Sequence, residues 1–161
     1  IVLSRLIPVG GNRFDEAIIN KIKKDKSFVI GEKTAEQIKM TIGAAYINTE
    51  TIDVCGRNLV TGLPSEITIS GEEVHEALAE LFQGIVDSVK IILERTPPEI
   101  SSDIYKSGVY ITGGSSRIKD LGRFVYDQLG LKVNLCEEPE STVVMGLGAI
   151  IEDPQLAKLT I

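Results

Sequence analysis

The sequence predicts an α/β fold in which a small β-rich lobe is inserted into a larger layered one. Apolar residues keep a three-four spacing over residues 74–93, which is typical of a long amphipathic helix. Residues 47–70 alternate in polarity and carry turn residues, which indicates a β meander between two helical segments. A β-branched and aromatic run over residues 109–112 ends at a glycine pair, and another helical pattern follows it. Together these patterns predict a mixed sheet with packed helices and a small inserted α+β subdomain.

The composition is that of a globular protein with an acidic balance. Of the 161 residues, 43% are hydrophobic and 25% are charged, which suffices for one well-buried domain or two small lobes. Lys and Arg total 17 against 23 Asp and Glu, so the net charge is −6 and no basic field is available to hold nucleic acid. We therefore expect no nucleic-acid partner.

Cysteine and histidine usage argues against two kinds of site. Cys55 and Cys136 fall in no metal-ligand spacing and His75 is the only histidine, so a zinc site or a histidine-based triad is close to excluded. We expect both thiols to be buried small hydrophobes in a reducing cytoplasm. The most apolar stretch, residues 84–93, is interrupted by two charges, so the sequence predicts no membrane-spanning segment.

The first 26 residues predict a strand and a helix. Residues 1–9 form a β-rich run that ends at Gly10-Gly11, and a helix capped by Asn12 is expected to follow. Because the run opens with Ile1 rather than methionine, we expect the chain to be a piece of a longer protein.

Residues 27–70 predict a connection, a helix and the meander. Thr34 and Gln37 have the spacing of a capping box, which predicts a helix that starts there and ends around Gly43.

Ser70 and Glu73 repeat the capping-box spacing and open the longest predicted helix, which Pro97-Pro98 ends. At 1.5 Å per residue this helix spans roughly 30 Å, the width of a small domain. After the glycine pair, a helix is expected to end at Gly130 with a left-handed cap, followed by a strand over residues 131–135.

A last helix is predicted over Thr142–Ile151, capped by Ser141. It carries Gly146, Gly148 and Ala149 close together. Because small residues weaken a helix, we expect them to admit close approach of a neighbouring backbone or a ligand.

Two groups of residues are candidates for binding. Gly113 and Gly114 can adopt φ > 0 and let a polar, anionic ligand approach a helix N-terminus, but a strand-to-helix turn also needs glycine for its own geometry. The sequence around them matches neither common phosphate-loop motif. Glu36 and Lys39 project from the same side of their helix, and their spacing alone favours an exposed ion pair of small value.

Four stretches resemble the bacterial cell-shape actins, the MreB family of the actin, Hsp70 and sugar-kinase superfamily. They are VGGNRFDEAI (9–18), IGEKTAEQIKMTIGAAY (30–46), GRNLVTGLP (56–64) and YITGGSSRIKDL (110–121). The resemblance covers nearly all of the chain and implies an actin-like ATPase (ribonuclease H-like) lobe. It implies a large IIA-like subdomain of residues 1–26 and 71–152, a small inserted IIB-like subdomain of residues 27–70, and a C-terminal tail of residues 153–161.

The resemblance also implies a nucleotide site between this lobe and an N-terminal one. Gly113, Gly114, Ser115 and Ser116 match the adenosine-binding loop, and Arg117 matches the position that covers the adenine face. Glu36 and Lys39 match the pair that contacts ribose and adenine. The phosphate loops and the Mg²⁺-associated aspartate belong to the N-terminal part, so Mg²⁺ is expected to be held mainly there. We expect no useful ATP hydrolysis by this chain alone and an ATPase activity in the parent protein.

The leading hypothesis is therefore the nucleotide-binding lobe of an MreB-like actin that sets cell shape. The resemblance implies head-to-tail filaments at the cytoplasmic face of the cell membrane, scaffold proteins of cell shape or elongation as partners, and membrane attachment through other parts of the parent. The exposed parts of residues 47–70 are a candidate filament interface or a solvated meander. Alternatives are the equivalent lobe of an Hsp70-like chaperone ATPase, which the string GGSSRI with Arg117 favours, and a binding module that kept the fold without nucleotide.

Overall fold

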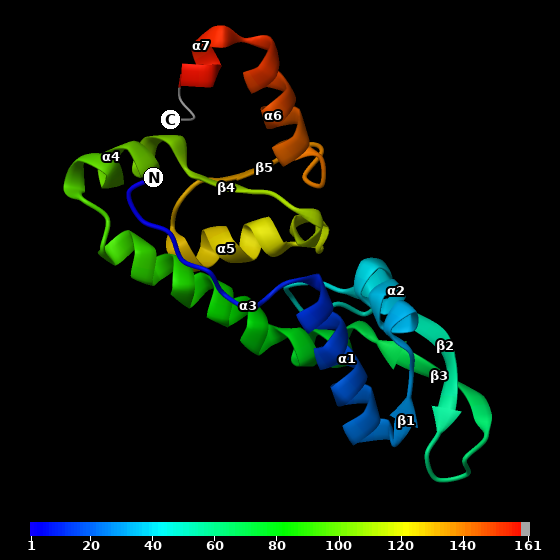
Figure 1. Ribbon diagram of the computed structural model, residues 1–161. Coiled ribbons are helices and arrows are strands. Elements are labelled where there is room, and N and C mark those ends of the chain that lie inside the picture. Colours follow the sequence, from blue (N-terminus) through cyan, green and yellow to red (C-terminus); the bar gives the residue numbers. More distant parts are fainter. Residues whose placement is uncertain (159–161) are drawn as a thin grey trace.

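The computed structural model describes residues 1–158 and contains two sheets joined by helices, which confirms the α/β class. Its elements are α1 (Gly11–Lys26), β1 (Phe28–Val29), α2 (Glu32–Ile42), β2 (Thr51–Asn58), β3 (Pro64–Ser70), α3 (Gly71–Glu94), α4 (Pro98–Ser107), β4 (Val109–Ile111), the short 3₁₀ helix η1 (Gly114–Arg117), α5 (Leu121–Leu129), β5 (Val133–Leu135), α6 (Thr142–Glu152) and α7 (Pro154–Ala157). The β2–β3 hairpin lies at one end of the chain's long axis and α6–α7 lie at the other (Figure 1). Within the predicted tail, residues 159–161 lie outside the described residues.

Strands β1, β2 and β3 form an antiparallel sheet in that order. Val54 and Ile69 point into the core, whereas the neighbouring positions on β2 are exposed or half-buried, as the period of two demands. The expectation that both thiols are buried is therefore wrong: Cys55 follows Val54 and lies on the exposed face, and Cys136 is half-buried.

The core lies where α1, α2 and α3 pack against this sheet. It contains Phe14, Ile18 and Ile22 of α1, Ala35, Ile38 and Ile42 of α2, and Val74, Leu78, Phe82 and Val86 of α3. The rings of Phe14 and Phe82 lie 5.4 Å apart, and Phe124 of α5 extends the cluster at 6.2 Å from Phe82. One continuous core thus joins the segments that the sequence assigns to two subdomains.

Helix α3 begins with the capping box that the sequence predicts. The Ser70 hydroxyl accepts from the Glu73 backbone N–H at 3.3 Å, and the Glu73 carboxylate accepts from the Ser70 N–H at 2.9 Å. These bonds satisfy backbone donors that a helix start otherwise leaves open.

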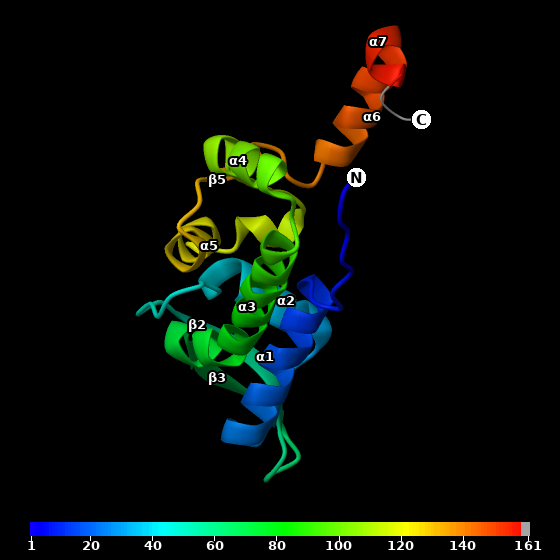
Figure 2. The same cartoon turned by 90° about the vertical axis from the view of Figure 1, so that its left-hand side faces the viewer.

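Strands β4 and β5 form a separate two-stranded parallel sheet, followed on the chain by α6. Helix α5 ends at Gly130 in the left-handed conformation, as predicted. Figure 2 shows α6 and α7 extending away from the other elements, and no residue of α6 is buried in the described chain.

Several local predictions are wrong. Residues 1–9 form no strand, because within residues 1–158 no strand pairs with them; they run extended past the end of α3. Gly10, not Asn12, is the N-cap of α1, and α2 starts at Glu32 after Gly31, so Thr34 caps nothing.

The last helix also differs from expectation. It covers Thr142–Glu152, but the Ser141 side chain makes no capping bond. Around Gly146 and Gly148, no atom of residues 1–158 other than those of the helix turn itself lies within 4 Å of the place of a Cβ, so no neighbouring backbone of the described chain makes the expected close approach, and approach of a ligand stays a prediction. No helix of the described chain is long and apolar enough to cross a bilayer.

Candidate functional site

A cavity of about 580 Å³ opens where the start of α1, the end of α2 and the loop after β4 converge. Its lining residues come from five segments: Gly11 and Asn12; Glu36, Lys39, Met40, Thr41 and Gly43; Glu50; Gly114, Ser115, Arg117, Ile118 and Lys119; and Glu140. Its size falls in the range of pockets that hold a small organic ligand.

The structure brings five of the seven predicted site residues together at this cavity: Glu36, Lys39, Gly114, Ser115 and Arg117. Ser115 and Arg117 arrive on η1, the single 3₁₀ turn that replaces the predicted start of an α-helix.

The other two, Gly113 and Ser116, do not line the cavity but stabilise the conformation of the loop. Gly113 has φ 87° and ψ 158°, a conformation that essentially only glycine adopts, and its N–H donates to the Pro139 carbonyl at 2.9 Å. Ser116 is buried, and its N–H donates to the Gly113 carbonyl at 3.0 Å. Of the two roles left open for the glycine pair, Gly113 serves the turn, and Gly114 lines the cavity.

Charged side chains line the cavity, and most of them are paired. Lys119 lies 2.5 Å from Glu50, and Arg117 lies 3.2 Å from Glu140. The hydrogen bond from Lys119 to Glu50 raises the pKa of Lys119, so this lysine stays charged at neutral pH. Both pairs are largely exposed, which makes each of them weak and easily opened.

Lys39 is paired as well, but not with Glu36. Its Nζ lies 2.8 Å from Asp15 Oδ1, and it donates to Asp15 Oδ2 at 3.0 Å and to the Gly11 carbonyl at 3.3 Å. The expected surface ion pair between Glu36 and Lys39 is therefore wrong. The partner stands 24 residues away on another helix, beyond the reach of a spacing argument.

Glu36 is the remaining charged group of the lining. Within residues 1–158 it takes part in none of the ion pairs or side-chain hydrogen bonds. An unpaired carboxylate at a cavity wall is an acceptor ready for hydroxyl or N–H donors of a ligand.

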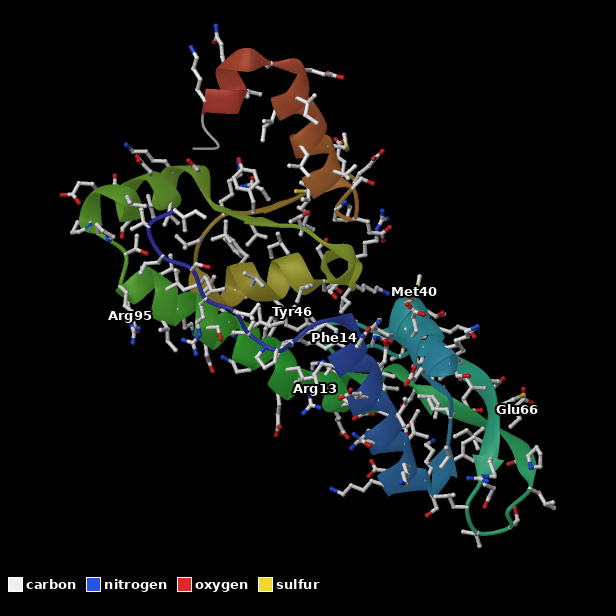
Figure 3. All side chains as sticks on the ribbon, in the orientation of Figure 1. Arg13, Phe14, Met40, Tyr46, Glu66 and Arg95 are labelled. Atoms are coloured by element: carbon white, nitrogen blue, oxygen red, sulfur yellow. The ribbon has the colours of Figure 1, made fainter. Side chains whose placement is uncertain are left out.

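Sequence reasoning missed several lining residues, and two of them had a signal. Met40 stands four residues after Glu36, so it belongs to the same helix face. Figure 3 shows it at the end of α2 that faces the loop after β4. Gly11 belongs to a second glycine pair at a helix start, and a Cβ there would stand 3.4 Å from Lys39 Nζ. Glu50, Lys119 and Glu140 had no local signal, because tertiary contacts alone bring them here.

The cavity combines an unpaired carboxylate, a glycine-lined wall, an apolar thioether and a guanidinium. This set suits a ligand with hydroxyl groups and a flat ring, since the guanidinium of Arg117 can stack on such a ring. Among residues 1–158, no three His, Cys, Asp or Glu side chains gather as a metal site would require.

Comparison with known proteins gives one consistent family. The MreB/Mbl protein family matches residues 1–159. The chain is 42% identical over 154 residues to the cell shape-determining protein MreB of Escherichia coli strain K12, covering 94% of this chain and 44% of that protein. It is 40% identical over 155 residues to Mbl of Bacillus subtilis strain 168, covering 95% of this chain and 46% of that protein.

Solved structures agree. The crystal structure of MreB5 of Spiroplasma citri bound to AMPPNP superimposes with a TM-score of 0.90 at 35% identity, over 98% of this chain and 47% of that one. The ADP-bound form of MreB5 gives a TM-score of 0.88 at 36% identity, over 92% of this chain and 46% of that one. The chain thus spans a little under half the length of the proteins it matches.

Proposed function

The chain belongs to the MreB/Mbl family of actin-like proteins, and we propose that it is the nucleotide-binding lobe of a bacterial actin that binds ATP between two lobes and polymerises into membrane-associated filaments that control cell shape. Because the family match extends over residues 1–159, the Hsp70-like alternative suggested by Arg117 is not favoured.

The observation that carries the nucleotide proposal is the cavity with an unpaired carboxylate opposite a glycine loop. Glu36 would accept hydrogen bonds from the ribose hydroxyls, and Gly114 and Ser115 would lie against the base. Arg117 would leave Glu140 and cover the ring. The proposal is supported by the MreB5 structures, which hold AMPPNP and ADP.

Phosphoryl transfer is assigned to the full-length protein rather than to this lobe. Bound Mg²⁺ would neutralise phosphate charge, and the residues that hold it are proposed to lie mainly in the other lobe. The residues of this chain bind and orient the nucleoside end, which fixes the position of the phosphates.

Self-assembly is proposed to use the β2–β3 hairpin. Its turn exposes three apolar side chains, Leu59, Val60 and Leu63, and Val60 is 82% exposed. A head-to-tail filament needs such a surface on one subunit to fit a different surface on the next. We place the protein in the cytoplasm at the inner face of the cell membrane, attached through other parts of the full-length protein and working with scaffold proteins of cell shape or elongation.

ATP-dependent pelleting of the full-length protein, measured with nucleotide binding at several protein concentrations, tests both parts. Wild type is expected to pellet above a threshold concentration, and Glu36→Ala and Gly114→Val are expected to lose nucleotide and assembly together. Nucleotide binding without pelleting at any concentration would remove the filament function and keep the site. A wild-type protein whose unfolding temperature does not respond to ATP would favour a binding module that has lost nucleotide.

A further inference from the structure

Asp15 and Lys39 form the least exposed ion pair in residues 1–158. Their side chains are 13% and 11% exposed, whereas every side chain in the other pairs is at least 26% exposed. The pair joins α1 to α2 at the edge of the core, where both helices reach the cavity.

The geometry holds the Lys39 head group in place with two hydrogen bonds and one further ion-pair contact. An ammonium group has three N–H donors. Two of them are used here, toward Asp15 Oδ2 at 3.0 Å and the Gly11 carbonyl at 3.3 Å, and Asp15 Oδ1 lies 2.8 Å from the same nitrogen. Asp15 Oδ1 is buried and has no hydrogen-bond partner among the described residues, so the charge of Lys39 is what compensates it.

The position of the pair connects it to the cavity wall. Lys39 follows Glu36 by three residues on α2, so a constraint on one fixes the helix face that presents the other. The place of a Gly11 Cβ lies 3.4 Å from Lys39 Nζ and 3.8 Å from Ser115 Oγ. Helix α1, helix α2 and the loop after β4 therefore meet at Gly11, beside the lysine head group.

We propose that Asp15 is a positioning residue of the nucleotide site. Its carboxylate holds Lys39 against α1, and this ion pair sets the spacing between α1, Glu36 and the glycine loop. The inference rests on the proposed nucleotide function. It gives Lys39 a role in positioning the cavity wall that its helix forms. Moving Lys39 away from Asp15 would leave the Asp15 carboxylate buried and unpaired, which is strongly unfavourable.

The experiment compares Asp15→Asn, Lys39→Met and the double variant in the full-length protein. The affinities for ATP and GTP are measured for each, together with the unfolding midpoint without nucleotide. Glu76→Gln is the matched control, because it removes an exposed ion pair between α1 and α3. An ion pair that only positions the helices does not distinguish adenine from guanine. Both single variants are therefore expected to lower the affinities for ATP and GTP by the same factor, about tenfold, which is a typical coupling between two sites. Because the two residues act as one unit, the double variant is expected to be no weaker than Lys39→Met.

Three results would overturn the inference. The first is a double variant that binds ATP much more weakly than Lys39→Met, which would show that Asp15 and Lys39 act separately. The second is ATP binding within about twofold of wild type in Asp15→Asn, as expected for Glu76→Gln. The third is a wild-type protein that binds neither nucleotide, which removes the proposed function as well. If Asp15→Asn does not fold, the double variant decides, since it leaves no unpaired buried charge: it should fold and bind about tenfold more weakly.

Discussion

Replacing Glu36 by Gln tests the carboxylate on which the nucleotide proposal depends. The substitution keeps the length of the side chain and one carbonyl acceptor but removes the charge. Glu36 has no ion-pair partner within the described chain, so its replacement leaves no partner charge unpaired. The substitution is therefore expected to change the binding of the ligand and not the packing of the protein. A hydrogen bond to a charged group contributes about 1.5 to 3 kcal/mol and a neutral one about 0.5 to 1.5 kcal/mol. The loss is then about 1 to 2 kcal/mol, or roughly five- to thirtyfold in Kd.

The assay is ATP titration of the full-length protein beside the control Glu32→Gln. Glu32 is the first residue of α2, one turn before Glu36, and does not line the cavity. The control loses only a favourable charge at the helix start, about 0.3 to 1 kcal/mol of stability, and should bind ATP as wild type does. Repeating the titration with 2′- and 3′-deoxy-ATP locates the contact, because the defect should shrink when the bonded hydroxyl is missing. Equal ATP affinity in wild type and Glu36→Gln, or an undiminished defect with both deoxy nucleotides, would refute the reasoning.

Four further results are expected. Ser70→Ala removes the cap of α3 and should lower stability by about 1 kcal/mol, a shift of roughly 2 to 4 °C in Tm. The same change at Ser88, inside that helix, should be near neutral, because its hydroxyl only bonds the carbonyl four residues back; equal losses at both sites would contradict the capping role. Burial raises the pKa of Glu73, but hydrogen bonds from the Ser70 backbone, a lysine and the Ser70 hydroxyl outweigh it and hold that pKa below its ordinary 4.5. Its contribution is thus present above pH 4.5 and lost as pH falls through the folded-state pKa, so the urea midpoints of wild type and Glu73→Gln should converge in acid and not at neutral pH. Val60→Asp at the exposed hairpin turn should abolish pelleting with ATP affinity unchanged, and pelleting at the wild-type threshold would exclude the turn from the interface. Gly113→Ala forces a side chain into a glycine-only conformation and should lower the free energy of unfolding, measured with denaturant, by about 1 to 3 kcal/mol. An unchanged free energy of unfolding would contradict this strain.

The parts of the fold that sequence predicts well are those with local causes. The Ser70–Glu73 box, the apolar stripe of α3 and the Gly130 cap depend on residues within a turn or two of each other, and all are found in the structure. Strand formation at residues 1–9 needs a partner strand, which β propensity cannot supply. The exposure of Cys55, in contrast, has a local cause. Once Val54 is placed in the core, alternation along the strand puts Cys55 on the exposed face.

The candidate site divides in the same way. Spacing alone favoured an ion pair for Glu36 and left the glycine pair open, and it was the family resemblance that made both candidates for the site. The sequence could not show that Lys39 turns to Asp15, or that Glu50 and Lys119 close one wall. Those contacts join residues 24 and 69 positions apart and exist only after the helices pack.

The hairpin that carries Val60 is a long arm whose root lies beside the cavity. Its ladder runs from the pair Thr51 and Ser70 to the pair Arg57 and Pro64 without a break, a stiff arm of about 20 Å at 3.4 Å per residue. At its root the Glu50 carbonyl accepts from the Gly71 N–H, and the Glu50 side chain meets Lys119 at the cavity wall. A rotation of about 5° at this root displaces the far end of the arm by about 2 Å, more than a bond length. A change in the shape of the cavity that turned this root would therefore be magnified at the exposed hairpin turn.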